Sequence, residues 1–394
     1  MAKEITIEEL EQIESSKFII DIRNKDSFEK GTYPNAVNIP LDVFNTNMIN
    51  IDKTIPVYIL CQTGQLSIDV ADSLEDLGFN AYNVKGGYYS YLKNKFRLML
   101  ANEEEIVARR QNAERSIIKK YRKQIWSPFT KALNEYQLIN DGDHIAVCIS
   151  GGKDSMLMAK LFQELLRHGK QNFEVVFLVM NPGYNDLNYS AVVENAKLLG
   201  IPIEVFNTEI FDIVADQGGS PCYLCARMRR GYLYSKAKEL GCNKIALGHH
   251  YDDVIETILM GMLYGAQIQT MMPKLHSTNF LGMELIRPMY LIREKDIIRW
   301  RDYNDLHFIQ CACRLTESCA SYGGTEQGSK RGAVKELIRN IAEKDPQIEK
   351  NIFRSVENVN LNTVIAYKQD GVQHHFLDSY MKKGTNQDGK QTNK

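Results

Sequence analysis

The chain has 394 residues, of which 44% are hydrophobic and 25% are charged, and its formal net charge at pH 7 is −1. These values are typical of a soluble globular protein, and the length predicts two or three domains. A membrane-spanning helix is excluded because no run of about 18 apolar residues occurs. The opening MAKEITIEEL lacks the basic and apolar regions of a secretory signal. We therefore expect a cytoplasmic protein that does not contact a membrane.

Short apolar runs alternate with helical patterns at the start of the chain. Residues 18–23 and 56–61 are apolar and β-branched, which predicts two buried strands. Residues 66–78 carry apolar side chains at intervals of three and four and end in glycine, which predicts a helix. Such alternation is typical of a parallel α/β sheet. We assign residues 1–97 to a small α/β domain.

Cys61 lies at the end of the second predicted strand and opens a short polar loop. The helix after this loop directs its N-terminus at the thiol, which favours a thiolate and then a persulfide. The region resembles the rhodanese-like domains through the stretches DIR (21–23), GTYPNAVNIP (31–40), LCQTGQLS (60–67) and GGYYSYL (86–92). The resemblance implies that Cys61 is a catalytic sulfur carrier, loaded by a cysteine desulfurase or another persulfide donor.

The Cys61 loop departs from the rhodanese pattern in its charge. Family loops usually carry arginine where this chain has Leu66, and Gln62 and Gln65 replace other polar or basic residues. Fewer positive charges predict weaker use of thiosulfate, while receipt of a persulfide is still expected. The alternative is an inactive rhodanese fold that serves as a docking module.

Residues 98–140 are predicted to form a helical connector, because residues 101–126 contain neither proline nor glycine and have high helix propensity. The stretch is first acidic and then basic. Its cations either form a solvated helix face or contact RNA. They are Arg109, Arg110, Arg115, Lys119, Lys120, Arg122 and Lys123.

A second alternation begins near residue 141. Strands are predicted at residues 144–150, 173–180, 201–207 and 244–250, and helices at residues 154–169 and 189–200. This pattern predicts a doubly wound parallel sheet, which we assign to residues 141–360. Residues 331–359 are predicted to be helical, and residues 361–394 are assigned to a C-terminal extension with a polar, disordered tail.

The loop SGGKDS (150–155) lies between a predicted strand and a predicted helix. Backbone N–H groups and a helix N-terminus form an anion site there, and the glycines allow close approach. The spacing is not that of the G-x-x-x-x-G-K-[ST] loop. Instead it resembles the phosphate loop of the N-type ATP pyrophosphatases, the PP-loop ATPases, although an ordinary turn is the alternative. The resemblance implies ATP and magnesium, with phosphate contact by Lys153 and a catalytic, magnesium-holding Asp154. The ATP-binding loop residues are Ser150, Gly151, Gly152, Lys153, Asp154 and Ser155.

A second glycine-containing turn, GHHYDDVIET (248–257), also follows a predicted strand and enters a helix. It resembles the second motif of PP-loop enzymes that act on tRNA, which implies ATP contacts by Gly248 and His249. The spacing is not H-E-x-x-H, so it does not favour a zinc site. Helix capping by Asp252 with structural histidines is the alternative.

Five cysteines cluster in the second half of the chain, which suggests metal or sulfur chemistry; they are Cys222, Cys225, Cys311, Cys313 and Cys319. Cys222 and Cys225 form a C-x-x-C followed by RMRRGYLY. Together with the loop at Ser150, KIALGHHYDD and IRPMYLIREKDI, this pattern resembles the tRNA 2-thiocytidine synthetase family over about residues 118–359. The resemblance implies a 4Fe–4S cluster held by Cys222, Cys225 and Cys313. Cys311 is the alternative third ligand, and zinc is the alternative metal. The resemblance is also compatible with a homodimer.

The resemblance implies that ATP adenylates the carbonyl oxygen of a tRNA base, the O2 of a cytosine. It also implies that sulfur relayed from a Cys61 persulfide replaces this oxygen, which leaves with AMP. Tethering the sulfur carrier to the sulfur-using domain raises its local concentration. tRNA phosphates are expected at Arg227, Arg229, Arg230 and the basic connector, unless these arginines pair with local acids. Two other functions remain open. They are thiolation of a uridine by the same chemistry, and sulfur trafficking or redox sensing by a nucleotide-binding protein that does not modify RNA.

Overall fold

A computed structural model describes residues 3–29, 31–44, 52–100, 102–169, 171–184, 186–211, 221–308, 330–378 and 380. The chain divides into two compact units. The first comprises Met1–Tyr251 and Pro273–Tyr322, and the second comprises Asp252–Met272 and Gly323–Lys394. Within the described part of the chain, no helix is both long and apolar enough to span a membrane.

The N-terminal sheet is parallel throughout and has the strand order β1-β5-β4-β2-β3. Both strands predicted from the apolar runs are confirmed, as β2 and β4. Helices cover the two faces, so β4 is buried along its whole length. The strands are β1 (Lys3–Ile5), β2 (Phe18–Asp21), β3 (Val37–Asn38), β4 (Val57–Leu60) and β5 (Ala81–Val84), and the helices are α1 (Ile7–Gln12), α2 (Lys25–Glu29), α3 (Leu66–Asp76) and α4 (Gly87–Leu100).

The connector is helical, as predicted, but it is not one regular helix. Asn102 caps α5 (Glu103–Ile118) through its side chain, which accepts a hydrogen bond from the N–H of Glu105. A π-helical turn, η2 (Arg122–Trp126), then leads into α6 (Ser127–Glu135). Pro128, in the first turn of α6, has no N–H to donate to the preceding turn, which accounts for the irregularity there.

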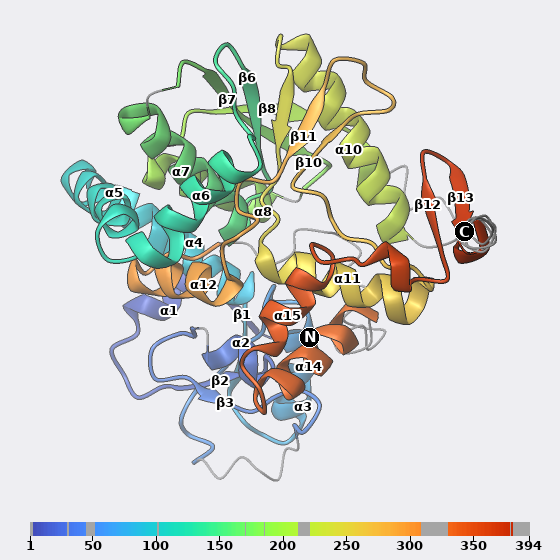
Figure 1. Cartoon of the computed structure of the whole chain (residues 1–394). Coiled ribbons are helices and arrows are strands. Elements are labelled where there is room, and N and C mark those ends of the chain that lie inside the picture. The colour runs from blue at the N-terminus through green and yellow to red at the C-terminus, as the bar shows by residue number, and fades with distance from the viewer. Residues whose placement is uncertain are drawn as a thin grey trace, which may run out of the picture. The chain divides into compact units, whose positions relative to one another are not determined.

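The second sheet has the strand order β10-β11-β9-β6-β7-β8, with β10 antiparallel and the other strands parallel. The side chains of β6 alternate between two cores: Ile145, Val147 and Ile149 face the core that includes α7, whereas Ala146 and Cys148 face the core that includes α10. Figure 1 shows these two helices on opposite sides of the sheet. The doubly wound arrangement is therefore confirmed. The strands are β6 (His144–Ile149), β7 (Glu174–Asn181), β8 (Ile203–Asn207), β9 (Lys244–Ala246), β10 (Lys274–His276) and β11 (Glu284–Ile286), and the helices are α7 (Lys153–His168), α8 (Asp186–Leu199), α10 (Pro221–Glu239) and α12 (Glu294–Tyr303).

The second unit is mainly helical. It contains most of α11 (Tyr251–Gly265), followed by α14 (Lys330–Ala342), α15 (Ile348–Ser355) and the short 3-10 helix η4 (Leu361–Thr363). The helix predicted over residues 331–359 is broken into α14 and α15, because Pro346 between them cannot continue the helical ladder.

The C-terminal extension contains an antiparallel hairpin of β12 (Ala366–Gln369) and β13 (Val372–His375), which we did not predict. Its turn is Asp370-Gly371, with φ of 51° and 80°, a turn chemistry that matches the twist of paired strands. The Asp-Gly pair was therefore a usable signal in the sequence. The tail predicted to be disordered lies outside the described residues.

Candidate functional site

The first site surrounds the thiol of Cys61, directly after β4. This side chain is 2% exposed, and its Sγ accepts hydrogen bonds from the N–H of Gly64 at 3.0 Å and the hydroxyl of Ser67 at 3.1 Å. The Oγ of Ser67 also lies 2.6 Å from Oδ1 of Asn83. Because this hydroxyl has one proton, it donates either to the sulfur of Cys61 or to Asn83 at any one time. Both donors can hold negative charge on the sulfur, as the predicted carrier role requires.

Two glycines allow the Cys61 loop to close. Gly87 has φ of 58°, and a Cβ there would lie 2.3 Å from the carbonyl oxygen of Cys61. A Cβ on Gly64, which has φ of 81°, would lie 2.5 Å from the N of Gly86. The same approach lets the N–H of Tyr88 donate to the carbonyl of Cys61 at 2.8 Å. Gly86 and Gly87 belong to the GGYYSYL motif of the sequence, but the close approach of Gly87 to Cys61 could not be predicted from it.

The charged side chains near Cys61 interact with other residues of the same domain. Arg23 is buried, pairs with Asp21 and lies 3.8 Å from the centre of the Tyr88 ring. Burial raises the pKa of Tyr88 to about 12, although Arg23 opposes this shift, so Tyr88 keeps its proton at neutral pH. Leu66, which stands where arginine is usual, is 48% exposed. The described surroundings of the sulfur are therefore neutral hydrogen-bond donors.

The second site is the loop between β6 and α7. Gly151 has φ of 84°, which favours glycine, and Gly152 is the N-cap of α7. The Ser155 hydroxyl accepts a hydrogen bond from the N–H of Ser150 at 3.1 Å and donates to the carbonyl of Gly152 at 3.0 Å. The hydroxyl of Ser155, a predicted ATP ligand, is thus used to close the loop. The N-terminus of a helix of 16 residues opens at this loop, which is a suitable anion site.

Lys153 and Asp154 form the charged part of this site. The Nζ of Lys153 lies 3.1 Å from Oδ2 of Asp154 and 3.1 Å from Oε1 of Glu294, in the first turn of α12. Burial by itself lowers the pKa of Lys153, but the two carboxylates outweigh it and raise that pKa above its ordinary value. Lys153 therefore stays charged at neutral pH. Glu294 was missed, because its place beside Lys153 depends on a contact across 141 residues of sequence.

The second predicted ATP motif lies against the start of α7. A Cβ on Gly248 would lie 3.3 Å from the carbonyl carbon of Asp154 and 3.3 Å from the N of Ser155, so glycine permits this close approach. His249 is half-buried, whereas His250 is buried and its Nε2 lies 3.8 Å from Oδ1 of Asp154. That Oδ1 is shielded from solvent and accepts no hydrogen bond from the described residues. An acceptor oxygen in this state fits a divalent cation.

Helix α10 brings the C-x-x-C segment into the first unit. Cys222 and Cys225 lie three positions apart near its N-terminus, where helix N–H groups favour thiolates. Cys225 is half-buried and packs against the main core. The side chain of Cys222 and all of Cys311 and Cys313 lie outside the described residues. Among the residues that the structure describes, no group of three His, Cys, Asp or Glu is suited to a metal.

One of the predicted tRNA contacts points inward. Arg229, on α10, donates from Nη2 to the hydroxyl of Tyr184 at 3.2 Å, and that hydroxyl donates to the carbonyl of Ser150 at 3.5 Å. Arg229 therefore connects the cysteine-bearing helix with the phosphate loop. Arg227 and Arg230 are exposed, as RNA contacts would need to be. Tyr184 was missed because no motif marks it.

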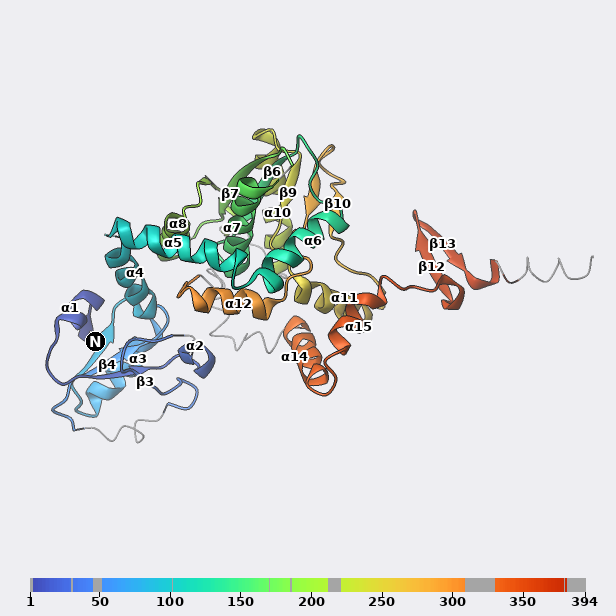
Figure 2. The ribbon, with the colours of Figure 1, turned by 60° about the vertical axis from the view of Figure 1, so that its left-hand side comes forward.

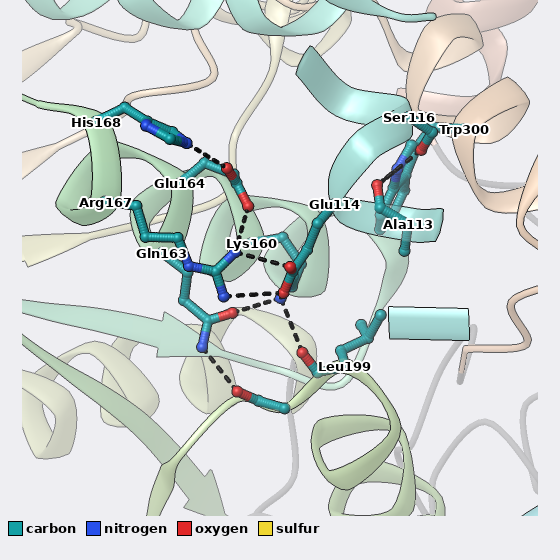
Figure 3. Close-up of polar contacts among 11 residues, drawn as sticks. Ala113, Glu114, Ser116, Lys160, Gln163, Glu164, Arg167, His168, Leu199 and Trp300 are labelled. Carbon is teal, nitrogen blue, oxygen red and sulfur yellow. Dashed lines mark hydrogen bonds and ion pairs between the residues drawn. The ribbon is translucent and has the colours of Figure 1, made fainter. Parts of the chain in front are cut away.

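An ionic network centred on the buried side chain of Lys160 fixes the phosphate-loop helix to the connector (Figure 3). Lys160 on α7 is fully buried, and its Nζ lies 2.6 Å from Oε1 of Glu114 on α5 and 2.9 Å from the carbonyl of Leu199. Arg167 reaches Oε2 of Glu114 at 2.7 Å and Oε1 of Glu164 at 2.8 Å. Burial lowers the pKa of Lys160, although Glu114 opposes this, and the Glu114 carboxyl has a lowered pKa because these cations outweigh its own burial. Helix α5 is therefore held on α7.

The two sites define a class of protein in which an α/β domain with a buried thiol precedes a doubly wound domain with a glycine-rich loop at a helix N-terminus. Residues 6–94 match the family model of the rhodanese-like domain, and residues 121–314 match that of the PP-loop domain. Both resemblances stated from the sequence are confirmed.

Relatives that the chain matches over most of their length identify the family within this class. The tRNA-cytidine(32) 2-sulfurtransferase of Coxiella burnetii (strain RSA 331 / Henzerling II) is 36% identical over 235 residues, which are 58% of this chain and 87% of the relative. The protein of that name from Vibrio cholerae serotype O1 (strain M66-2) is 34% identical over 264 residues, which are 66% of this chain and 81% of the relative. The chain belongs to the tRNA-cytidine(32) 2-sulfurtransferase family.

The chain is also similar to solved structures, which include the U34-tRNA thiolase NcsA from Methanococcus maripaludis with its [4Fe-4S] cluster. It is 20% identical with a TM-score of 0.47, and the match covers 65% of this chain and 87% of that one. A rhodanese-like domain protein from Staphylococcus aureus is 36% identical with a TM-score of 0.22, and the match covers 23% of this chain and 90% of that one.

Proposed function

We propose that this protein is an ATP-dependent tRNA sulfurtransferase that converts cytidine 32 into 2-thiocytidine. The base oxygen O2 attacks the α-phosphate of ATP and releases pyrophosphate, and sulfur then adds to C2 and expels AMP with the former O2. The observation that carries the proposal is a phosphate loop between β6 and α7 in a chain that belongs to this family. The tRNA substrate and its position are taken from the names of the relatives.

The residues of the second site would have different roles in adenylation. The loop of Ser150, Gly151 and Gly152 offers backbone donors at the N-terminus of α7, and Lys153 adds a positive charge beside them. Asp154 would hold magnesium through the shielded Oδ1, which places positive charge near the phosphates. Gly248 keeps the turn that carries His249 close to this loop.

Cys222 and Cys225, with Cys313 or Cys311, would hold a 4Fe–4S cluster. Their fit rests on donor chemistry, since the C-x-x-C lies near a helix N-terminus and thiolates are the usual ligands of such clusters. Held by three cysteines, the cluster would supply an iron with an open position for sulfur. Anaerobic purification followed by iron, sulfide and zinc analysis distinguishes this cluster from a zinc site.

The sulfur would arrive on Cys61. The outer sulfur of a Cys61 persulfide is at the oxidation level of elemental sulfur, so its delivery as sulfide requires two electrons from a thiol reductant and returns Cys61 as a thiolate. The Gly64 and Ser67 donors stabilise the anionic forms at both ends of this cycle. A persulfide-loaded desulfurase is the expected donor.

The purified holoprotein tests adenylation directly. With ATP, magnesium and unmodified tRNA, we expect AMP release that depends on tRNA. A nucleotide-binding protein for sulfur trafficking alone would release no AMP when tRNA is added. Nucleoside mass spectrometry of the same reaction distinguishes 2-thiocytidine from a thiouridine, which is the product of the alternative substrate.

A further inference from the structure

The outer side of the connector carries a stripe of exposed cations. Arg115 and Lys119 lie at the end of α5, and Arg122 and Lys123 lie on the π-helical turn η2. They lie within nine consecutive residues at the junction of α5 and η2, and all four side chains are exposed there. We call these four residues the connector stripe.

No carboxylate among the described residues neutralises the connector stripe. The sequence has no Asp or Glu between Glu114 and Glu135, and Glu114 points inward to Lys160 and Arg167. Two other cations of the first unit, by contrast, are paired, Arg109 with Asp305 and Arg299 with Asp296. Like charges four residues apart destabilise a helix by a few tenths of a kcal/mol per pair.

Aromatic surface adjoins the stripe. The Nζ of Lys120 lies 3.3 Å from the centre of the Tyr303 ring, and Tyr303 is 46% exposed. Helix α12, which carries Tyr303, lies beside α5 (Figure 2). It is fixed there by Trp300, whose indole N–H donates to the carbonyl of Ala113 at 3.4 Å (Figure 3). A half-exposed ring at the border of a basic stripe is suited to contact with nucleic acid.

We propose that the connector stripe binds the phosphate backbone of the tRNA substrate, an inference that rests on the proposed function. The structure selects these cations from the longer basic stretch, since Arg109 is paired and Gly200 lies against the Arg110 guanidinium. An acidic membrane fits less well, because the apolar side chains beside the stripe, Ile117 and Ile125, are buried and are not available for insertion. The contact positions the tRNA and carries no base specificity.

The test is the salt dependence of tRNA binding. The triple variant Lys119→Gln/Arg122→Gln/Lys123→Gln removes three charges from exposed positions, and Lys131→Gln removes one from an exposed lysine that pairs with Glu135. We expect the triple variant to bind tRNA on the order of tenfold or more weakly, and its slope of log affinity against log salt to be shallower by about two to three. Lys131→Gln should change neither quantity, and circular dichroism should confirm that both variants fold.

Each other outcome has a defined meaning. An unchanged slope in the triple variant, while the wild type binds and thiolates tRNA, would overturn the stripe and leave the proposed function standing. An equal loss in Lys131→Gln would also overturn it, because the effect would then follow overall charge. If the triple variant loses binding only to vesicles of phosphatidylserine and phosphatidylcholine, the surface is a lipid site. A wild type that neither binds nor thiolates tRNA would instead contradict the proposed function.

Discussion

Cys61 shows how one residue obtains its chemistry from the backbone around it. Its position at the end of a buried strand, before a polar loop and a helix, could be read from the sequence because each signal is local. The contribution of Gly87, 26 positions later, could not, since it depends on the approach of two backbone segments. The same holds for Lys153, whose partner Glu294 lies on a distant helix.

Replacing Cys61 separates sulfur delivery from adenylation. We expect Cys61→Ser to retain tRNA-dependent AMP release but to lose nearly all thiolation when a persulfide-loaded desulfurase is the donor. The hydroxyl cannot form a persulfide. Inorganic sulfide should restore thiolation in the variant, because it bypasses the carrier. Undiminished thiolation by the variant with the persulfide donor would refute the relay.

The Arg229–Tyr184 contact predicts coupling between α10 and the phosphate loop. Tyr184→Phe removes one hydroxyl, and we expect kcat to fall by about fivefold, as for about 1 kcal/mol of hydrogen bonding. In a double-mutant cycle with Arg229→Gln, the two losses should be less than additive, because both changes break one connection. Independent effects would indicate that Arg229 acts elsewhere, such as on tRNA, as its sequence position first suggested.

At the scale of elements, helix and strand positions were largely predictable because apolar periodicity is strong in both sheets. The exceptions have physical reasons. Strands β10 and β11 contain only three residues each, too few for a periodic signal. The π-helical turn depends on Pro128 and on packing against α12, which no local propensity reports. Lys160 lies in an otherwise apolar pattern, and its burial is explained by partners distant in sequence, Glu114 and the carbonyl of Leu199.

The ionic network between α5 and α7 predicts a large stability effect. Glu114→Gln leaves Lys160 buried without its carboxylate, and we expect a loss of about 3–5 kcal/mol in the free energy of unfolding. Glu135→Gln makes the same chemical change in an exposed pair and should cost less than about 1 kcal/mol. Urea denaturation measures both. Equal effects would mean that the network contributes little.

The same variant has a predicted pH dependence. The pKa of Glu114 is lowered below its ordinary value of 4.5, so its stabilisation is complete above that pH and is lost as the pH falls through the lowered pKa. The difference between wild type and Glu114→Gln should therefore be constant around neutrality and shrink in acid. A difference that grew as the pH fell would contradict the assigned charges.

At the scale of the whole chain, the order of a rhodanese-like domain before a PP-loop domain could be predicted, because each domain has contiguous motifs. Which segments of the chain make up the second unit could not be predicted. There Arg331 on α14 pairs with Asp253 at 2.9 Å and Glu256 at 2.7 Å on α11, which joins segments more than 70 residues apart. Covalent linkage of carrier and acceptor supports a relay within one polypeptide, since it raises the effective concentration of the donor sulfur.

The most direct test of the central claim is the thionucleoside content of tRNA from a strain in which this gene is deleted. We predict that 2-thiocytidine disappears while thiouridines persist, and that the wild-type gene, but not Cys61→Ser, restores it. Retention of 2-thiocytidine with loss of a thiouridine would contradict the account and assign the chemistry to a different base.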